Sequence, residues 1–110
     1  MVYWFALALA IVFEVAGTMS LKYAAITNSM VYAALTFCCY LLTFTLMWYA
    51  IKKLDISLAY AIWAGVGVAL ITFGGMVLFN ESFTPIKIFF IAMIIIGVVG
   101  LKISDTAQVA

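Results

Sequence analysis

The chain has 110 residues, of which 70% are hydrophobic and only 8% are charged, whereas soluble domains have about 45–50% apolar and 25% charged residues. So few polar side chains cannot cover a water-exposed domain of this size, and the mean hydropathy of +1.35 indicates a lipid environment. The net charge of +1 comes from five lysines and four acids spread along the chain, which excludes the basic stripe of a nucleic-acid-binding protein. We therefore expect an integral membrane protein with no nucleic-acid partner.

Charged residues and turn formers divide the chain into four apolar stretches of about 18 to 24 residues, a length that suits a bilayer core of about 30 Å. The stretches are 2–21, 30–51, 56–79 and 86–103. Short connections, such as 22–29, make successive helices antiparallel neighbours, and the chain ends in a short tail at 104–110. The predicted fold is an all-α membrane protein in which residues 1–110 form one four-helix transmembrane domain.

The sequence lacks the residues that several chemistries need. It has no histidine and only two cysteines, Cys38 and Cys39, whose side chains diverge by about 100° on a helix and cannot bridge each other. It has no glycine-rich phosphate loop, and Glu14 has no second acid, nucleophile or metal ligand near it in the chain. We expect no metal, no cofactor and no enzymatic activity.

The lysines give the only signal for orientation in the membrane. The side with both termini and the second connection carries Lys52, Lys53 and Lys102, and the opposite side carries Lys22 and Lys87. Positive residues favour the cytoplasmic side, and three against two is a weak bias. Two interpretations stay open, one fixed orientation or insertion in both orientations. The second would supply an antiparallel dimer with the symmetry of an inverted repeat.

Glu14 is the one carboxylate within the predicted spans, about three residues from the middle of 2–21. A central acid costs about 2.5 to 3.5 kcal/mol on insertion, and such residues usually line an ion or substrate pathway. Ala10, Gly17 and Thr18 lie on the same helical face. These small residues either permit a close helix contact or leave room for a ligand beside Glu14. We expect Glu14 to bind protons or substrate, and the alternative is a protonated structural residue.

Two aromatic pairs lie inside the spans rather than at their ends. Tyr60 and Trp63 share a face with Gly67 in the third stretch, and Tyr40 and Phe44 form a similar pair in the second. Such pairs are commonly core packing. Ring faces also attract cations by about 0.5 to 2 kcal/mol each, and a carboxylate in a low-dielectric site adds a weakly screened Coulomb attraction. With the carboxylate of the first stretch, the pairs predict a pocket for a hydrophobic cation.

Glycines mark two further positions of interest. Gly65 and Gly67 lie in the third stretch, where glycine permits bending and close packing, and we expect a hinge there. Gly97 and Gly100 lie on one side of the otherwise bulky fourth stretch, with a spacing that suits a tight helix contact. We expect the fourth helix to make the assembly contact.

Two sequence runs point to a known family. The first is EVAGT at 14–18, followed by Leu21 and Lys22, and the second is AYAIWAGVG at 59–67. With four spans in 110 residues, the chain resembles the small multidrug resistance family of bacterial proton-coupled exporters over essentially its whole length.

The resemblance implies an antiparallel dimer in which both copies of Glu14 bind either protons or a cationic substrate. It also implies that the segment 65–67 bends during transport and that the fourth helix, with Gly97 and Gly100, holds the dimer together. The residues expected to line the pocket are Ala10, Gly17, Thr18, Tyr40, Phe44, Tyr60 and Trp63.

The chain departs from the family pattern at two places. Members specialised for guanidinium carry a tryptophan just after the glutamate, where this chain has Gly17 and Thr18, and this difference disfavours the guanidinium class. Phe90 stands where many multidrug members have the first glycine of a pair. The runs at 17–22 and 80–82 are similar to one member of the paired polyamine exporters, which keeps a heterodimer open.

The sequence therefore predicts a proton-coupled antiporter that exports hydrophobic or quaternary organic cations across the bacterial inner membrane as a multi-pass homodimer. Four alternatives stay open. Two are related transporters: one subunit of a heterodimeric polyamine exporter, formed with a paralogous chain, and a guanidinium exporter. The other two are a structural subunit of a larger membrane complex and a passive cation channel with an acidic ring.

Overall fold

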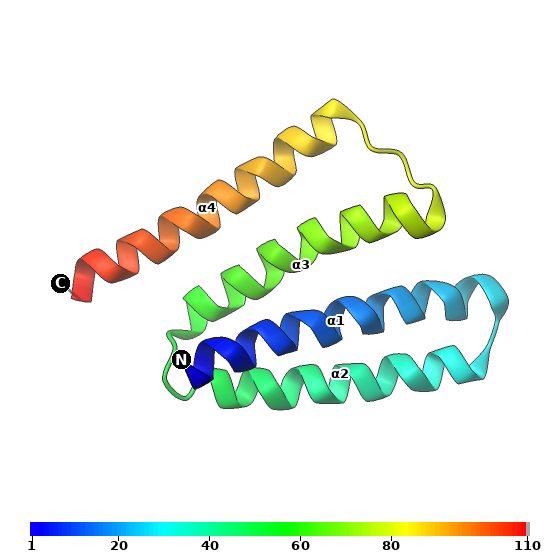
Figure 1. Cartoon of the computed structure of the whole chain (residues 1–110), viewed down its shortest axis with the longest axis horizontal. Coiled ribbons are helices and arrows are strands. Elements are labelled where there is room, and N and C mark those ends of the chain that lie inside the picture. The colour runs from blue at the N-terminus through cyan, green and yellow to red at the C-terminus, as the bar shows by residue number, and fades with distance from the viewer. Residues whose placement is uncertain (110) are drawn as a thin grey trace. The chain divides into compact units, whose positions relative to one another are not determined.

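The structure is a computed structural model that describes the backbone of residues 1–109 and the side chains of residues 1–104. The described chain is all-helical (Figure 1). Its four helices are α1 (Val2–Thr27), α2 (Met30–Ala50), α3 (Ile56–Phe79) and α4 (Pro85–Val109). Each helix is long and apolar enough to cross a membrane. In α4 the segment with these properties is Pro85–Ser104. The prediction of an all-α, multi-pass membrane protein is therefore confirmed.

The chain forms two compact helical hairpins, α1 with α2 and α3 with α4, and the boundary between them falls between Leu54 and Asp55. Each hairpin has a tight connection that follows an asparagine in the left-handed conformation: Asn28 has φ 54° and Asn80 has φ 56°. Asparagine tolerates this conformation better than most residues, so it ends a helix cleanly. How the hairpins assemble into one four-helix domain stays a prediction.

Two helices run further than the apolar stretches predicted. α1 continues through the expected connection at 22–29 as far as Thr27, because a helix satisfies its own backbone hydrogen bonds and needs no lipid to persist. α4 likewise continues past 103, through the predicted tail to Val109. One consequence is that Glu14 lies at the middle of α1, twelve residues after its first residue and thirteen before its last.

The first hairpin has a core of small and branched residues. On α1 the buried positions include Leu7, Ala10 and Gly17, and on α2 they include Cys39 and Thr43. Small side chains allow membrane helices to approach closely, so dispersion contacts are made along the backbone. The two helices thus pack tightly along the stretch that contains Glu14.

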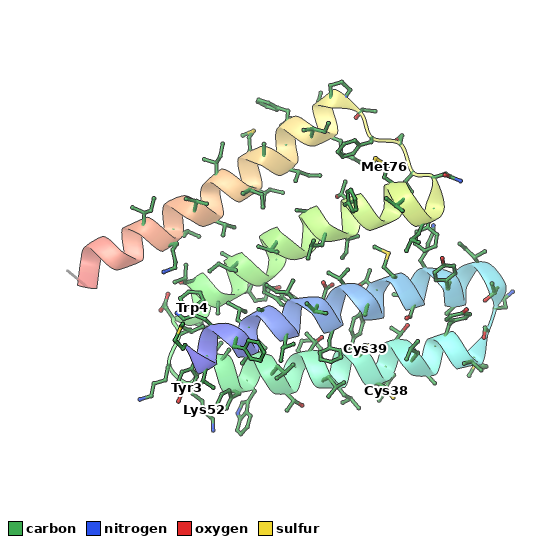
Figure 2. The ribbon with its side chains drawn as sticks, in the orientation of Figure 1. Tyr3, Trp4, Cys38, Cys39, Lys52 and Met76 are labelled. Carbon is green, nitrogen blue, oxygen red and sulfur yellow. The ribbon has the colours of Figure 1, made fainter. Side chains whose placement is uncertain are left out.

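Aromatic stacks lie at both ends of the first hairpin. Tyr3 stacks on Tyr49 with ring centroids 5.0 Å apart, and Tyr23 stacks on Tyr32 at 5.5 Å. At the first end the Lys52 ammonium lies 4.2 Å from the ring centroid of Trp48 and 5.8 Å from that of Tyr49. Tyr3 and Lys52 accordingly lie at the same end of the hairpin (Figure 2). These clusters have the composition of the aromatic belts that flank membrane spans.

The second hairpin is closed by local contacts at its connection. The backbone N–H of Glu81 donates to the carbonyl of Gly75 at 3.2 Å, and the Glu81 carboxylate lies against the same glycine. Thr84 caps α4, since its hydroxyl accepts from the N–H of Lys87 at 3.2 Å, and Pro85 occupies the first helical position. The sequence of the connection therefore fixes where α3 ends and α4 begins.

Candidate functional site

Glu14 lies partly buried at the middle of α1, and its carboxylate has a hydroxyl donor one turn further along the same helix. The Thr18 hydroxyl donates to Oε1 of Glu14 at 3.0 Å. The spacing of four residues brings these side chains to the same face of the helix. The sequence predicted this pair of positions for the site, and the structure brings their side chains together.

Tyr40 reaches the same hydroxyl from α2. Its phenol oxygen lies 2.8 Å from Oγ1 of Thr18, which joins the two helices beside Glu14. Gly17 permits this approach, because a Cβ atom at that position would lie 2.8 Å from Cε1 of Tyr40 and 3.0 Å from Cβ of Cys39. The predicted lining residues Gly17, Thr18 and Tyr40 therefore meet around the carboxylate.

A second polar contact joins the helices on the other side of Glu14. The Thr43 hydroxyl donates to the backbone carbonyl of Ala10 at 3.2 Å, and the Thr43 side chain is 1% exposed. Ala10 precedes Glu14 by one helical turn and Thr18 follows it by one. The interhelical contacts of Thr43 and Tyr40 thus flank the carboxylate and fix the register of α1 against α2.

Thr43 is a site residue that the sequence analysis missed. The available signal is its position one turn after Tyr40 on α2, within an otherwise apolar segment of the helix. A threonine at this position is equally compatible with a hydroxyl that donates to a carbonyl of its own helix. Thr36 and Thr45 do so, with the carbonyls of Tyr32 and Leu41. Only the packing of α1 against α2 distinguishes the two cases.

The predicted aromatic residues have different environments. Phe44 on α2 is 62% exposed. On α3, Tyr60 and Trp63 form a tilted pair with ring centroids 5.4 Å apart, and Tyr60 is 61% exposed. Nε1 of Trp63 is buried, and within the described residues it has no hydrogen-bond partner. The second hairpin therefore carries a ring pair in which Tyr60 is exposed, and a buried N–H donor without a hydrogen-bond partner among the described residues.

The predicted hinge and assembly glycines differ in their surroundings. Gly65 and Gly67 are buried, and a Cβ at Gly65 would lie 2.6 Å from Cγ2 of Val98, so α3 and α4 approach closely there. α3 is nevertheless one continuous helix through these glycines. Gly97 and Gly100 on α4 are exposed, and a Cβ added at either would meet no described atom within 4 Å. The hinge and the dimer contact stay predictions.

The described residues contain no group of three histidine, cysteine or acidic side chains that could hold a metal ion. Cys38 is exposed and Cys39 is buried, and both are free thiols (Figure 2). The chemistry gathered around Glu14 is consequently that of a carboxylate with hydroxyl donors and a phenol ring. Such a group can exchange a proton or neutralise a cation.

A comparison with known families agrees with this architecture. The family model described as Small Multidrug Resistance protein matches residues 2–94. The match covers α1, α2, α3 and the first part of α4, and it contains Glu14 with all of its described partners. The chain therefore belongs to the small multidrug resistance family, whose members are membrane transporters for multidrug efflux and not enzymes.

Proposed function

We propose that this protein is a proton-coupled antiporter that exports hydrophobic or quaternary organic cations, and that protons and the cation compete for Glu14. The observation that carries the proposal is the position of this carboxylate at the middle of a membrane-spanning helix, with the Thr18 hydroxyl 3.0 Å away. A group so costly to insert in lipid is usually part of an ion or substrate pathway.

Competition follows from the charge of the carboxyl group. A proton neutralises Glu14 covalently, and a bound cation neutralises it by pairing, so each state avoids a lone charge in a low-dielectric environment. The two ligands therefore exclude each other at one site. If the loaded site opens alternately to the two sides, inward flow of protons drives outward flow of cations.

The aromatic side chains suit a large cation. The Tyr40 phenol lies 2.8 Å from the Thr18 hydroxyl that bonds Glu14, and the second hairpin carries a ring pair of the exposed Tyr60 and the partly buried Trp63. Each ring face can attract a cation by about 0.5 to 2 kcal/mol, depending on how far the cation is desolvated. Phe44, which is 62% exposed, belongs to the proposed lining on α2, and the small residues Ala10 and Gly17 belong to it on α1.

The functional unit we propose is an antiparallel homodimer in the bacterial inner membrane. Two inverted copies give the symmetry that larger transporters obtain from an internal inverted repeat. The open faces at Gly97 and Gly100 suit the assembly contact, because exposed glycines let a second helix approach its backbone. The closely packed glycines Gly65 and Gly67 are the proposed hinge.

Transport by the purified chain alone tests the proposal. The protein is reconstituted in liposomes, and currents are recorded after perfusion with tetraphenylphosphonium, spermidine or guanidinium, with and without a proton gradient. We expect a tetraphenylphosphonium current that requires the proton gradient and disappears in Glu14→Gln, which keeps the shape but not the charge. Glu81→Gln is the matched control, since Glu81 lies in the connection between α3 and α4.

Three results would contradict the proposal in different ways. Full proton-driven export by Glu14→Gln would exclude competition at this residue. A current for spermidine alone, or silence with all three cations that ends when a paralogous chain is added, would favour a heterodimeric polyamine exporter. A current that proton gradients do not affect would favour a passive channel.

A further inference from the structure

We infer that Thr18 and Tyr40 are positioning residues that form a directional chain of hydroxyl groups ending on Glu14. We call this series of two hydrogen bonds, from Tyr40 through Thr18 to Glu14, the hydroxyl relay. It stabilises the ionised form of Glu14 and thereby sets how readily a cation displaces the proton. The inference rests on the proposed function, because it assigns residues that govern the same competition.

The geometry of the hydroxyl relay is that of two consecutive hydrogen bonds. Oη of Tyr40 lies 2.8 Å from Oγ1 of Thr18, and Oγ1 lies 3.0 Å from Oε1 of Glu14. Both distances fall within the ordinary range for hydrogen bonds between oxygen atoms. The relay crosses from α2 to α1, so it depends on both helices of the hairpin.

Counting protons fixes the direction of the relay when Glu14 is ionised. A carboxylate can only accept, so the single hydroxyl proton of Thr18 is donated to Glu14. Oγ1 of Thr18 has then no proton left for its contact with Tyr40, so it accepts in that contact. The Tyr40 hydroxyl is therefore the donor. The two dipoles point toward the negative charge in series, and a chain of this kind strengthens each of its bonds.

Few other ionisable groups act on Glu14 from within this hairpin. α2 contributes the Tyr40 phenol and the thiol of the buried Cys39, whose Cβ lies against Gly17. On α1 the nearest charged residue in the sequence is Lys22, eight residues further on and about 12 Å along the helix axis. Among the described residues of this hairpin, the Thr18 hydroxyl therefore bonds the carboxylate directly, and the Tyr40 phenol acts on it through Thr18.

The absence of a side chain at Gly17 is what lets the relay form. A Cβ there would lie 2.8 Å from Cε1 and 2.9 Å from Cδ1 of Tyr40, which is closer than these atoms can approach. The ring would have to move away from α1, and its phenol oxygen would lose the 2.8 Å contact with Thr18. Gly17 thus acts on the relay through Tyr40.

Removing a donor from the relay changes the competition in a specific way. Hydrogen bonds to the charged form favour that form, so a carboxylate that loses its donors holds a proton more tightly. The cation then binds more weakly wherever protons compete, which is at acidic and neutral pH. As the pH rises, the falling proton concentration weakens the competition in every variant, and the cation affinity returns toward that of the wild type.

The test measures tetraphenylphosphonium binding by titration calorimetry at mildly acidic and at alkaline pH, with the full chain in lipid nanodiscs. This cation has no group that titrates, so any pH effect belongs to the protein. Thr18→Val and Tyr40→Phe remove one hydroxyl each and keep the shape. We expect about tenfold weaker binding at acidic pH and less than about twofold at alkaline pH.

Two further variants serve as controls. Thr18→Ser keeps the hydroxyl and should bind within about twofold of the wild type at both pH values, because only a methyl group is lost. Thr45→Val removes a hydroxyl that is bonded to the carbonyl of Leu41 on its own helix at 2.8 Å. It should leave the pH profile unchanged.

Each outcome decides the inference. Equal losses at both pH values for Thr18→Val would mean that the side chain acts only through packing, and would overturn the relay, as would a profile identical to that of the wild type. Failure of the proposed function has a different signature: the wild type would bind the cation independently of pH and Glu14→Gln would bind it equally well.

Discussion

The two hairpins hold their helices together by different means. In the first, hydroxyl groups cross between α1 and α2 on both sides of Glu14, from Tyr40 to Thr18 and from Thr43 to Ala10. In the second, α3 presents a glycine, Gly65, against branched apolar side chains of α4. Within lipid, hydrophobic burial gives no advantage to helix association, so polar bonds and close packing are the two means available.

This difference assigns different tasks to the two halves of the chain. A polar contact fixes the distance and register of its partners, which suits the half that must keep a carboxylate in one geometry. A glycine packed against methyl groups brings two helices close together but does not fix their orientation. In addition, the described part of the α4 span has no buried residue. We therefore expect the first hairpin to be the more rigid and the second to be the one that moves and assembles.

The largest expected effect comes from adding one methyl group to each hairpin. Gly17→Ala brings a Cβ to within 3.0 Å of both Tyr40 and Cys39, and Gly65→Ala brings one to 2.6 Å from Cγ2 of Val98, a methyl group that β-branching holds near one rotamer. Overpacking costs about 1–3 kcal/mol, and we expect the larger loss for Gly17→Ala, because moving the Tyr40 ring also breaks its 2.8 Å hydrogen bond with Thr18. Unfolding in mixed micelles by added denaturing detergent measures both, and equal losses would remove the contrast in rigidity.

A smaller effect is expected from the buried hydroxyl contact. Thr43→Val keeps the shape of the side chain but loses the bond to the Ala10 carbonyl, at a cost of about 1 kcal/mol. Thr72→Val is its control in the second hairpin, because the Thr72 hydroxyl bonds the carbonyl of Val68 on its own helix at 2.8 Å. The same micelle unfolding assay compares them. A loss in Thr72→Val as large as that in Thr43→Val would show that the interhelical bond contributes nothing of its own.

The smallest effect on the single chain is expected on the open face of α4. Gly97→Ala and Gly100→Ala add methyl groups where none of the described side chains lies within 4 Å, so the unfolding free energy should change by less than about 0.5 kcal/mol. The proposed dimer should nevertheless weaken, because the added methyl groups keep a second helix away from the backbone. Sedimentation in matched-density micelles measures the dimer fraction. An unchanged fraction would exclude these glycines from the contact.

Much of this architecture follows from local properties of the sequence. Span length and hydropathy predict the four helices, and the insertion cost of a central acid identifies Glu14. The same-face spacing on one helix also brings Thr18 to Glu14, since no information beyond α1 is needed. Residues that act within one helix are therefore accessible to sequence reasoning.

The contacts between helices are less accessible. Whether Tyr40 or a neighbour meets Thr18, and whether Thr43 bonds its own helix or α1, depends on the register of the two helices, which small differences in side-chain packing decide. The C-terminal end of α1 also differs from the prediction: the helix ends at Thr27 and the predicted stretch ends at residue 21. Hydropathy indicates where a chain leaves the lipid and not where its helix ends. The pocket lining from α3, the dimer and the substrate stay predictions that the experiments above address.

The middle of a helix has a property that no other position shares. When a membrane helix that is centred on the bilayer is turned end over end, every residue changes its depth except the one at the centre, and Glu14 lies within one residue of the centre of α1. In a helix centred on the bilayer, the carboxylate would therefore lie at the same depth in either orientation of the chain. Protons arriving from either compartment would also travel equal distances along the helix to reach it.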